Sequence, residues 1–184
     1  VGQGGRMSAM DPSDGTLRWE VPIATPRGAN DVEKLADLIA PVARDDELLC
    51  ARAFQASVGC VDAGTGQLRW SKLANGASGL ALDADKVYGT EADGVVRAWG
   101  RNEGENKWST DRLRYRSLSA PLVIGRSVAV GDNTGLVHLL SREDGKPLNR
   151  MSTDGSAIVA APVLVAGRMV VVTAKGGVFA FGAQ

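Results

Sequence analysis

The sequence predicts an all-β fold, and the observations that predict it are a repeated phrase, short strands at regular spacing and glycine-rich turns. The phrase DPSDGTLRW at residues 11–19 returns as DAGTGQLRW at residues 62–70. Two weaker copies, NEGENKW and REDGKPLN, end at Trp108 and Asn149. The closing residues of the four copies are 51, 38 and 41 residues apart, so the chain is an array of similar units.

A short strand is expected before each phrase. The five copies of this strand begin near Gly5, Ala56, Gly94, Gly135 and Gly176. Stretches such as SVAVGDNTGLVHLL and MVVVTAKGGVFAF are β-branched runs interrupted at glycine, which supplies the positive φ that a tight hairpin needs. A further strand after the Ala-Pro pairs at Pro121 and Pro162 brings each unit to about four antiparallel strands.

A repeat of about 41 residues with four strands is typical of a β-propeller blade. Each blade has two apolar faces that only neighbouring blades can cover, so blades stack around a shared axis. We therefore expect one partial propeller domain over residues 1–184, with about four blades. Four blades is also the lower limit of known propellers, so the repeat count equally fits a closed four-bladed ring.

The tryptophan of the phrase is expected to be structural. Trp19, Trp70 and Trp108 recur at one blade position, where an aromatic ring between adjacent blades would bury much apolar area. Stacking on a ligand is the alternative. Asp11 and Asp62 recur with the turn, so we expect their carboxylates to accept hydrogen bonds from turn amides rather than to act as bases.

Composition excludes several classes of function. The 184 residues are 44% hydrophobic, enough to bury a core, and the 21 basic and 21 acidic residues cancel. No net field therefore favours nucleic acid or an anionic membrane. No apolar run approaches the roughly 20 residues of a membrane-spanning helix. The sequence begins without methionine and shows no leader, so we expect a processed chain or a fragment.

No catalytic or metal site is expected. The chain lacks an HExxH motif, a CxxC motif, a phosphate-binding loop and a nucleophile elbow. His138, the only histidine, falls in the strand GLVHLL, where a structural role is more common than ligation.

The two cysteines, Cys50 and Cys60, are expected to be free thiols packed as small hydrophobes. A hairpin that turns on residues 55–56 would place Cys50 opposite Val61 and point Cys60 to the other sheet face. A register shifted by one residue would instead place the two cysteines directly opposite each other.

The phrase VDAGTGQLRW at residues 61–70 resembles the repeat of pyrroloquinoline-quinone-type propellers. Two longer stretches, residues 30–42 and residues 111–146, resemble segments of the BamB family, lipoproteins of the machinery that folds β-barrels into the bacterial outer membrane. The resemblance covers essentially the whole chain. It implies an eight-bladed ring, of which this chain is the C-terminal half, and a lipid anchor at the periplasmic face that this sequence lacks.

The resemblance also implies a partner. In the BamB family an inserted loop contributes to contact with the barrel-forming subunit BamA, through acidic residues that follow a leucine. The matching loop here spans residues 25–40 and carries the implied partner-binding residues Leu35, Asp37 and Leu38. Asp37 matches the first acidic position, whereas Ile39 stands near the second. A solvent-facing connection whose leucines pack against a blade is the alternative.

The implied function is a noncatalytic scaffold without a cofactor, which binds the periplasmic domains of BamA and extended strands of unfolded outer-membrane proteins. A half ring would expose the edge of the GGVFAF strand and two open blade faces, through which two copies are expected to pair. A quinone-dependent propeller dehydrogenase or sensor domain is the alternative function. Arg112, Arg114 and Arg116 alternate in sequence and would share one face of a strand, suited to an acidic partner.

Overall fold

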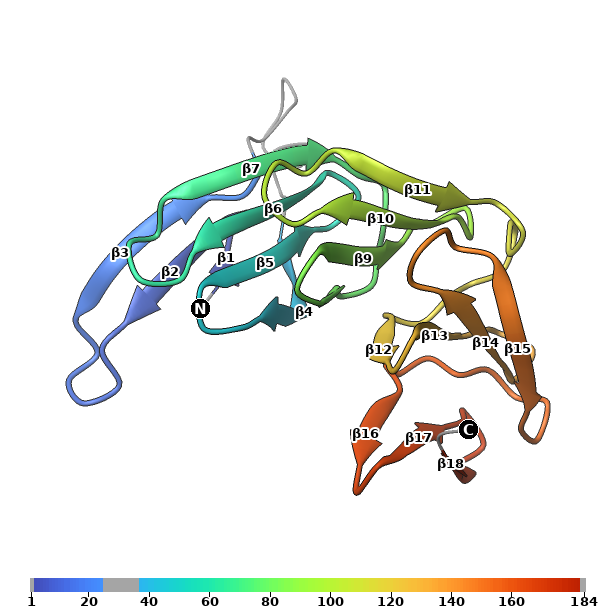
Figure 1. Cartoon of the computed structure of the whole chain (residues 1–184). Helices are drawn as coiled ribbons and strands as arrows, with labels where there is room; N and C mark the ends of the chain where they lie inside the picture. The colour runs from blue at the N-terminus through green and yellow to red at the C-terminus, as the bar shows by residue number, and fades with distance from the viewer. Residues whose placement is uncertain (1, 25–36, 183–184) are drawn as a thin grey trace, which may run out of the picture.

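The structure is a computed structural model that describes residues 2–24 and 37–182 (Figure 1). Every regular element in this part of the chain is a β-strand, and the strands form five antiparallel sheets. No helix in the described residues could cross a membrane.

The three central sheets have four strands each, hydrogen-bonded in chain order. The second sheet contains β4 (Leu38–Arg44), β5 (Leu48–Ala53), β6 (Ser57–Asp62) and β7 (Leu68–Leu73). The third sheet contains β8 (Ala81–Leu82), β9 (Lys86–Thr90), β10 (Val96–Gly100) and β11 (Asn106–Thr110). The fourth sheet contains β12 (Leu122–Ile124), β13 (Ser127–Gly131), β14 (Leu136–Ser141) and β15 (Pro147–Ser152).

The first and fifth sheets have three strands each. The first contains β1 (Gly2–Gln3), β2 (Arg6–Met10) and β3 (Leu17–Pro22), and the fifth contains β16 (Val163–Val165), β17 (Arg168–Val172) and β18 (Val178–Gly182). The repeated phrase begins at the end of the third strand of each complete blade and leads into the fourth. β18 corresponds to a third strand, and it forms the edge of its sheet with no fourth strand beside it among the described residues.

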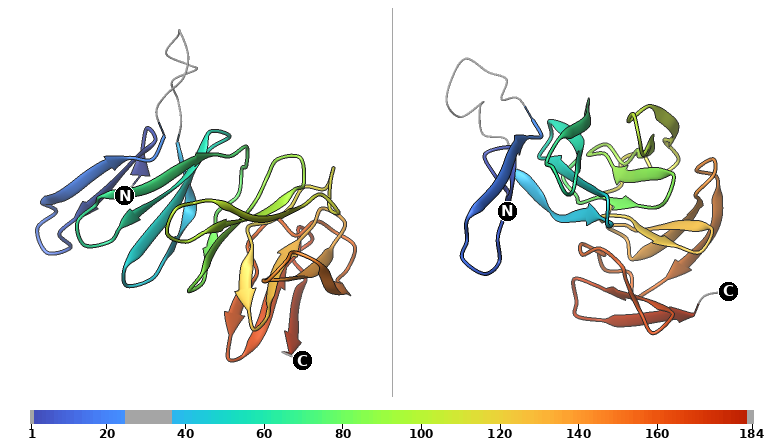
Figure 2. Two further views of the ribbon diagram at one scale, coloured as in Figure 1. Left: turned by 45° about the horizontal axis from the view of Figure 1, so that its top comes forward. Right: turned by 60° about the vertical axis from the view of Figure 1, so that its left-hand side comes forward.

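The sheets follow one another along an arc, with β1–β3 at one end and β16–β18 at the other (Figures 1 and 2). Strands β3, β7 and β11 lie along the outer side of this arc (Figure 1). The predicted all-β propeller of about four blades is confirmed.

Burial explains why the blades alternate strongly apolar and polar strands. All five residues of β13 are buried, because sheets cover both of its faces. The outer strands β7 and β11 are largely exposed, and the tryptophan is the one buried residue in each. Separate clusters of buried side chains fill the spaces between successive sheets, so the core is divided among the seams between blades.

Candidate functional site

The seams between blades are built around the repeated tryptophans. Trp70 and Trp108 are buried, and their indole Nε1 atoms donate hydrogen bonds across the seam. Trp70 bonds the carbonyl oxygen of Arg101 at 2.8 Å, and Trp108 bonds that of Arg142 at 3.0 Å. Each indole therefore has both its apolar ring and its polar nitrogen satisfied by the next blade.

A turn glycine of the next blade lies against each ring. All three glycines have positive φ, and a Cβ added to any of them would overlap the ring. The pairs are Trp19 with Gly66, Trp70 with Gly104 and Trp108 with Gly145. Trp19 is only half-buried. Each copy of the phrase thus takes part in two contacts. Its tryptophan packs on the turn glycine of the following blade, and its own glycine packs on the tryptophan of the preceding blade.

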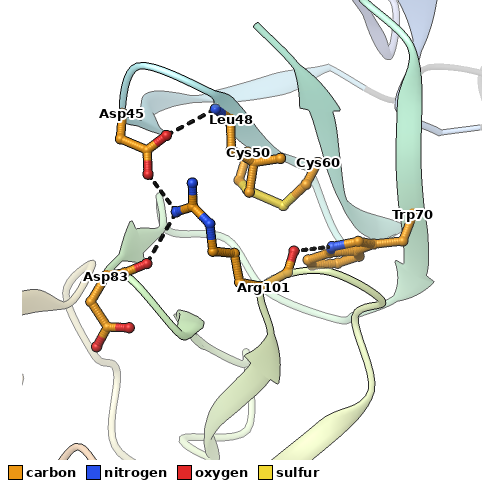
Figure 3. The surroundings of a disulfide bond; sticks show 7 residues. All are labelled: Asp45, Leu48, Cys50, Cys60, Trp70, Asp83 and Arg101. Carbon is orange, nitrogen blue, oxygen red and sulfur yellow. Dashed lines mark hydrogen bonds and ion pairs between the residues drawn. A yellow bond between two sulfur atoms is a disulfide. The ribbon is translucent and has the colours of Figure 1, made fainter.

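Arg101 and Arg142 each form an ion pair with an aspartate of the preceding blade. These two contacts, here called the arginine latches, were not predicted from the sequence. The Arg101 guanidinium pairs with the Asp45 carboxylate in the turn between β4 and β5 of the preceding blade, and it donates to the Asp83 carbonyl oxygen at 3.2 Å (Figure 3). Arg142 repeats the arrangement one blade later, since its Nε bonds the Asp83 carboxylate at 2.7 Å. The hydrogen bond from Arg101 holds the pKa of Asp45 at about 2.

The aspartate that opens the phrase caps its turn, as predicted. Asp62 Oδ1 accepts hydrogen bonds from the backbone N–H groups of Gly64 at 3.1 Å and Thr65 at 2.9 Å. Its other oxygen accepts from Arg69 at 2.7 Å, and this bond is the largest cause of an Asp62 pKa of about 2. In the first sheet Asp11 likewise accepts from the backbone N–H of Ser13 at 2.9 Å.

Cys50 and Cys60 form a disulfide, so the expectation of free thiols is wrong. The pair lies in adjacent strands β5 and β6, directly opposite each other, and both residues are fully buried beside Trp70 (Figure 3). The error came from the hairpin turn, which has three residues, 54–56, rather than two. Because of the extra residue, the register shifts by one and the cysteines face each other.

One of the three predicted partner-binding residues is not described by the structure, and the other two differ in their exposure to solvent. Leu35 lies outside the described residues. Asp37 is exposed immediately before β4, and its carbonyl oxygen accepts a 2.9 Å hydrogen bond from the N–H of Phe54. Leu38 begins β4 inside the predicted loop, and its half-buried side chain packs against the core between the first and second sheets. Of the two described residues, Asp37 is the one that offers its side chain to solvent.

The arginines of DRLRYR do not share a strand face, so that expectation is wrong. Residues 111–117 form a turn and irregular backbone, within which Tyr115 adopts a left-handed conformation with φ of 66°. Arg116 pairs with Asp132 and Arg114 lies 3.8 Å from Asp93, so two of the three arginines already have acidic neighbours.

His138 is a buried neighbour of Asp132, with its Nε2 atom 2.8 Å from the carboxylate. An ionised carboxylate only accepts hydrogen bonds, so Nε2 carries the proton. Across residues 2–24 and 37–182, no three side chains of the His, Cys, Asp and Glu types are grouped so that they could hold a metal ion.

Comparisons with known proteins agree with this architecture. The sequence matches the family described as outer membrane protein assembly factor BamB over residues 1–110 and 116–184. The BamB of Burkholderia pseudomallei is 39% identical over 97% of this chain and 47% of that protein, and the BamB of Bordetella pertussis is 38% identical over 94% and 45%. The crystal structure of BamB from Moraxella catarrhalis superposes with a TM-score of 0.87 at 29% identity, covering 96% of this chain and 53% of that one.

Fold and seams together define a β-propeller of pyrroloquinoline-quinone-like repeats. The chain belongs to the family of outer membrane protein assembly factor BamB, and the resemblance noted in the sequence is confirmed. It spans about half the length of the curated relatives that it matches.

Proposed function

We propose that this chain is part of a noncatalytic scaffold of the bacterial machinery that assembles β-barrel proteins, acting at the periplasmic face of the outer membrane. The observation that carries this proposal is the match to assembly factors over nearly the whole chain, at up to 39% identity. The buried tryptophans, arginine latches and disulfide give a rigid array of blades, as a scaffold requires.

The proposed partner is BamA, bound through the rim that carries Asp37. This side chain is exposed while its backbone is tied to the β5–β6 turn through Phe54, so the carboxylate is presented from a fixed position. Leu38 supports this position by packing beneath it. A rim residue with a fixed backbone and an exposed charge suits recognition by a basic partner surface.

Capture of the chain by immobilised periplasmic domains of BamA tests the proposal. Asp37→Lys should weaken capture at least about tenfold, as expected for reversal of one interfacial charge. Asp46→Lys is the matched control, since Asp46 is also exposed but lies in the turn at the other end of β4. Equal capture of the Asp37→Lys and unaltered chains would remove Asp37 from the interface, and absence of any capture would contradict BamA as the partner.

No strand of the described residues pairs with the outer edge of β18, and this edge is the proposed place for extended strands of unfolded outer-membrane proteins. Alternate residues of this strand are exposed, and Val178 is among the most exposed apolar side chains. The same edge and the exposed residues 163–165 of β16 favour the pairing of two copies. Light scattering over a range of concentrations distinguishes pairing from a chain that remains monomeric.

A further inference from the structure

A hollow of about 400 Å³, here called the rim pocket, lies between the second and third sheets. It opens among the β5–β6 turn, the end of β7 and the β9–β10 turn, and its lining includes Gln55, Asn75, Glu91 and Arg97. The pocket lies on the same rim as Asp37, because the carbonyl oxygen of Asp37 accepts a hydrogen bond from the N–H of Phe54, the residue before Gln55. No part of the proposed BamA contact depends on it.

Buried polar atoms without hydrogen-bond partners surround this pocket. Glu91 is only 7% exposed, and its Oε1 has no hydrogen-bond partner in the described part of the chain. The buried Nε of Arg97 also lacks one. Behind Glu91, Arg52 is fully buried, and none of its three side-chain nitrogens has a hydrogen-bond partner among the described residues. Arg52 and Glu91 face each other as an ion pair, so Arg97 is the lining donor that lacks an acceptor within the described ranges. Buried donors in proteins are nearly always hydrogen-bonded, which indicates a missing acceptor at Arg97.

In the described part of the chain, the charged groups around the pocket pair with one another except for Arg97. Arg52 and Arg97 both lie over the ring of Trp99, at 6.0 and 5.9 Å from its centre. Glu91 is the nearest carboxylate, and its closest approach to Arg52 is 3.7 Å, an ion pair without a hydrogen bond. Asp93 at the pocket mouth already faces Arg114 at 3.8 Å. Arg97 is thus left without an acidic partner among the described residues, and a ligand carboxylate would supply the acceptor that it lacks.

Exposed apolar side chains border the pocket mouth. Phe54, Leu73 and Tyr115 are 47%, 65% and 88% exposed. Leu73 lines the pocket, and the N–H of Tyr115 donates a 2.8 Å hydrogen bond to the carbonyl of Asp93, another lining residue. Tyr115 and Gln55 both hold a left-handed backbone, an unfavourable conformation for residues other than glycine. A small anion would leave the apolar side chains uncovered, whereas an acidic residue within an apolar polypeptide segment would cover them.

We propose that the rim pocket binds an acidic side chain of a partner polypeptide. The carboxylate accepts hydrogen bonds from Arg97 and from the side-chain amides of Gln55 and Asn75. The apolar residues on either side of it pack on Leu73 and its exposed neighbours. Arg52 acts through Glu91 as a positioning residue and does not touch the ligand.

Fluorescence anisotropy with a labelled peptide of alternating phenylalanine and glutamate tests the proposal. The control is the same peptide with every glutamate replaced by glutamine. The glutamate peptide should bind about tenfold more tightly, the effect of one charge-assisted hydrogen bond. Arg97→Gln should abolish that difference. Arg112→Gln, a change at an exposed arginine of the neighbouring turn, should leave it unchanged.

A second pair of variants keeps the test decisive if Arg97→Gln does not fold. Leu73→Glu places a negative charge at the pocket mouth and should repel the glutamate peptide, while Leu73→Gln should affect both peptides equally. Equal binding of the two peptides, or a preference that survives both Arg97→Gln and Leu73→Glu, would overturn the proposal. Displacement of the glutamate peptide by low-millimolar glutarate would also overturn it, because the site would then serve a free small carboxylate.

Discussion

The indole Nε1 of Trp70 donates a 2.8 Å hydrogen bond to the carbonyl oxygen of Arg101, and the guanidinium of the same arginine pairs with Asp45 in the blade that carries the tryptophan. One residue in the β10–β11 turn of the third blade thus contacts the second blade at two separate places. Because the indole is buried and its hydrogen bond lies within the seam, both its packing and its polar contact contribute to stability.

Replacing Trp70 should reveal these two contributions. Trp70→Ala removes the ring and the hydrogen bond, and it should lower the free energy of unfolding by about 3–5 kcal/mol. Trp70→Phe retains much of the apolar contact but leaves the Arg101 carbonyl without its partner, so its cost should be clearly smaller. Urea titration followed by circular dichroism measures both. Trp19→Ala is the control, and a loss as large as that of Trp70→Ala at this half-exposed position would contradict the seam account.

The turn glycines allow a matched comparison. Gly104 and Gly15 occupy the same turn position in different blades, with φ of 66° and 74°. A Cβ on Gly104 would overlap the Trp70 ring, whereas one on Gly15 would meet no atom within 4 Å. Gly104→Ala should therefore be more destabilising than Gly15→Ala by about 1–3 kcal/mol, the usual cost of overpacking. Equal melting temperatures for the two variants would show that the positive φ alone, and not the contact with Trp70, accounts for glycine at this turn position.

The disulfide should stabilise the second blade. Cys50 and Cys60 are ten residues apart, and closing a loop of this size is worth about 2–3 kcal/mol through the unfolded chain. The double variant Cys50→Ala, Cys60→Ala should lose roughly this amount in urea titration. Mass spectrometry after alkylation, with and without a reductant, checks the bond itself. Two alkyl groups on unreduced, denatured protein would show that the thiols are free.

Acid should weaken the fourth blade through Asp132. Burial alone would raise the pKa of this carboxyl, but hydrogen bonds from His138, Leu136 and Thr134 outweigh burial and lower it to about 2. The folded pKa is below the unfolded one, so the resulting stability is complete above pH 4 and is lost as the pH falls toward 2.

Asp132→Asn removes this titration. The difference in unfolding free energy between the unaltered chain and the variant should shrink by roughly 2 kcal/mol between pH 5 and pH 2. Urea titrations at a series of pH values measure the difference. A difference that stays constant over this range would show that Asp132 has an ordinary pKa in the folded protein.

The sequence predicted the blades well because a repeat places equivalent residues at equivalent points of the fold. Trp70 and Trp108 were found for this reason, as was the capping role of Asp62. The register of the β5–β6 hairpin was not, because Gln55 adopts a positive φ without being glycine and a single extra turn residue decides which cysteine faces which.

The arginine latches were missed for a different reason. When the copies are aligned on their closing residues, Arg101 and Arg142 both fall one residue after the position of Asp62, and this recurrence was a readable signal. Their partners, however, lie in the preceding blade, 56 residues away for Arg101 and Asp45. The rim pocket was missed likewise, since Arg52 and Glu91 come from different blades and nothing in either local sequence pairs them.

The core is divided among separate seams, so each sheet is stabilised only by packing against the sheets next to it, as in a repeat protein with nearest-neighbour interactions. Such an array transmits cooperativity only through intact junctions. Damage at the junction between the second and third sheets should therefore separate one melting transition into two, with the flanking segments unfolding independently.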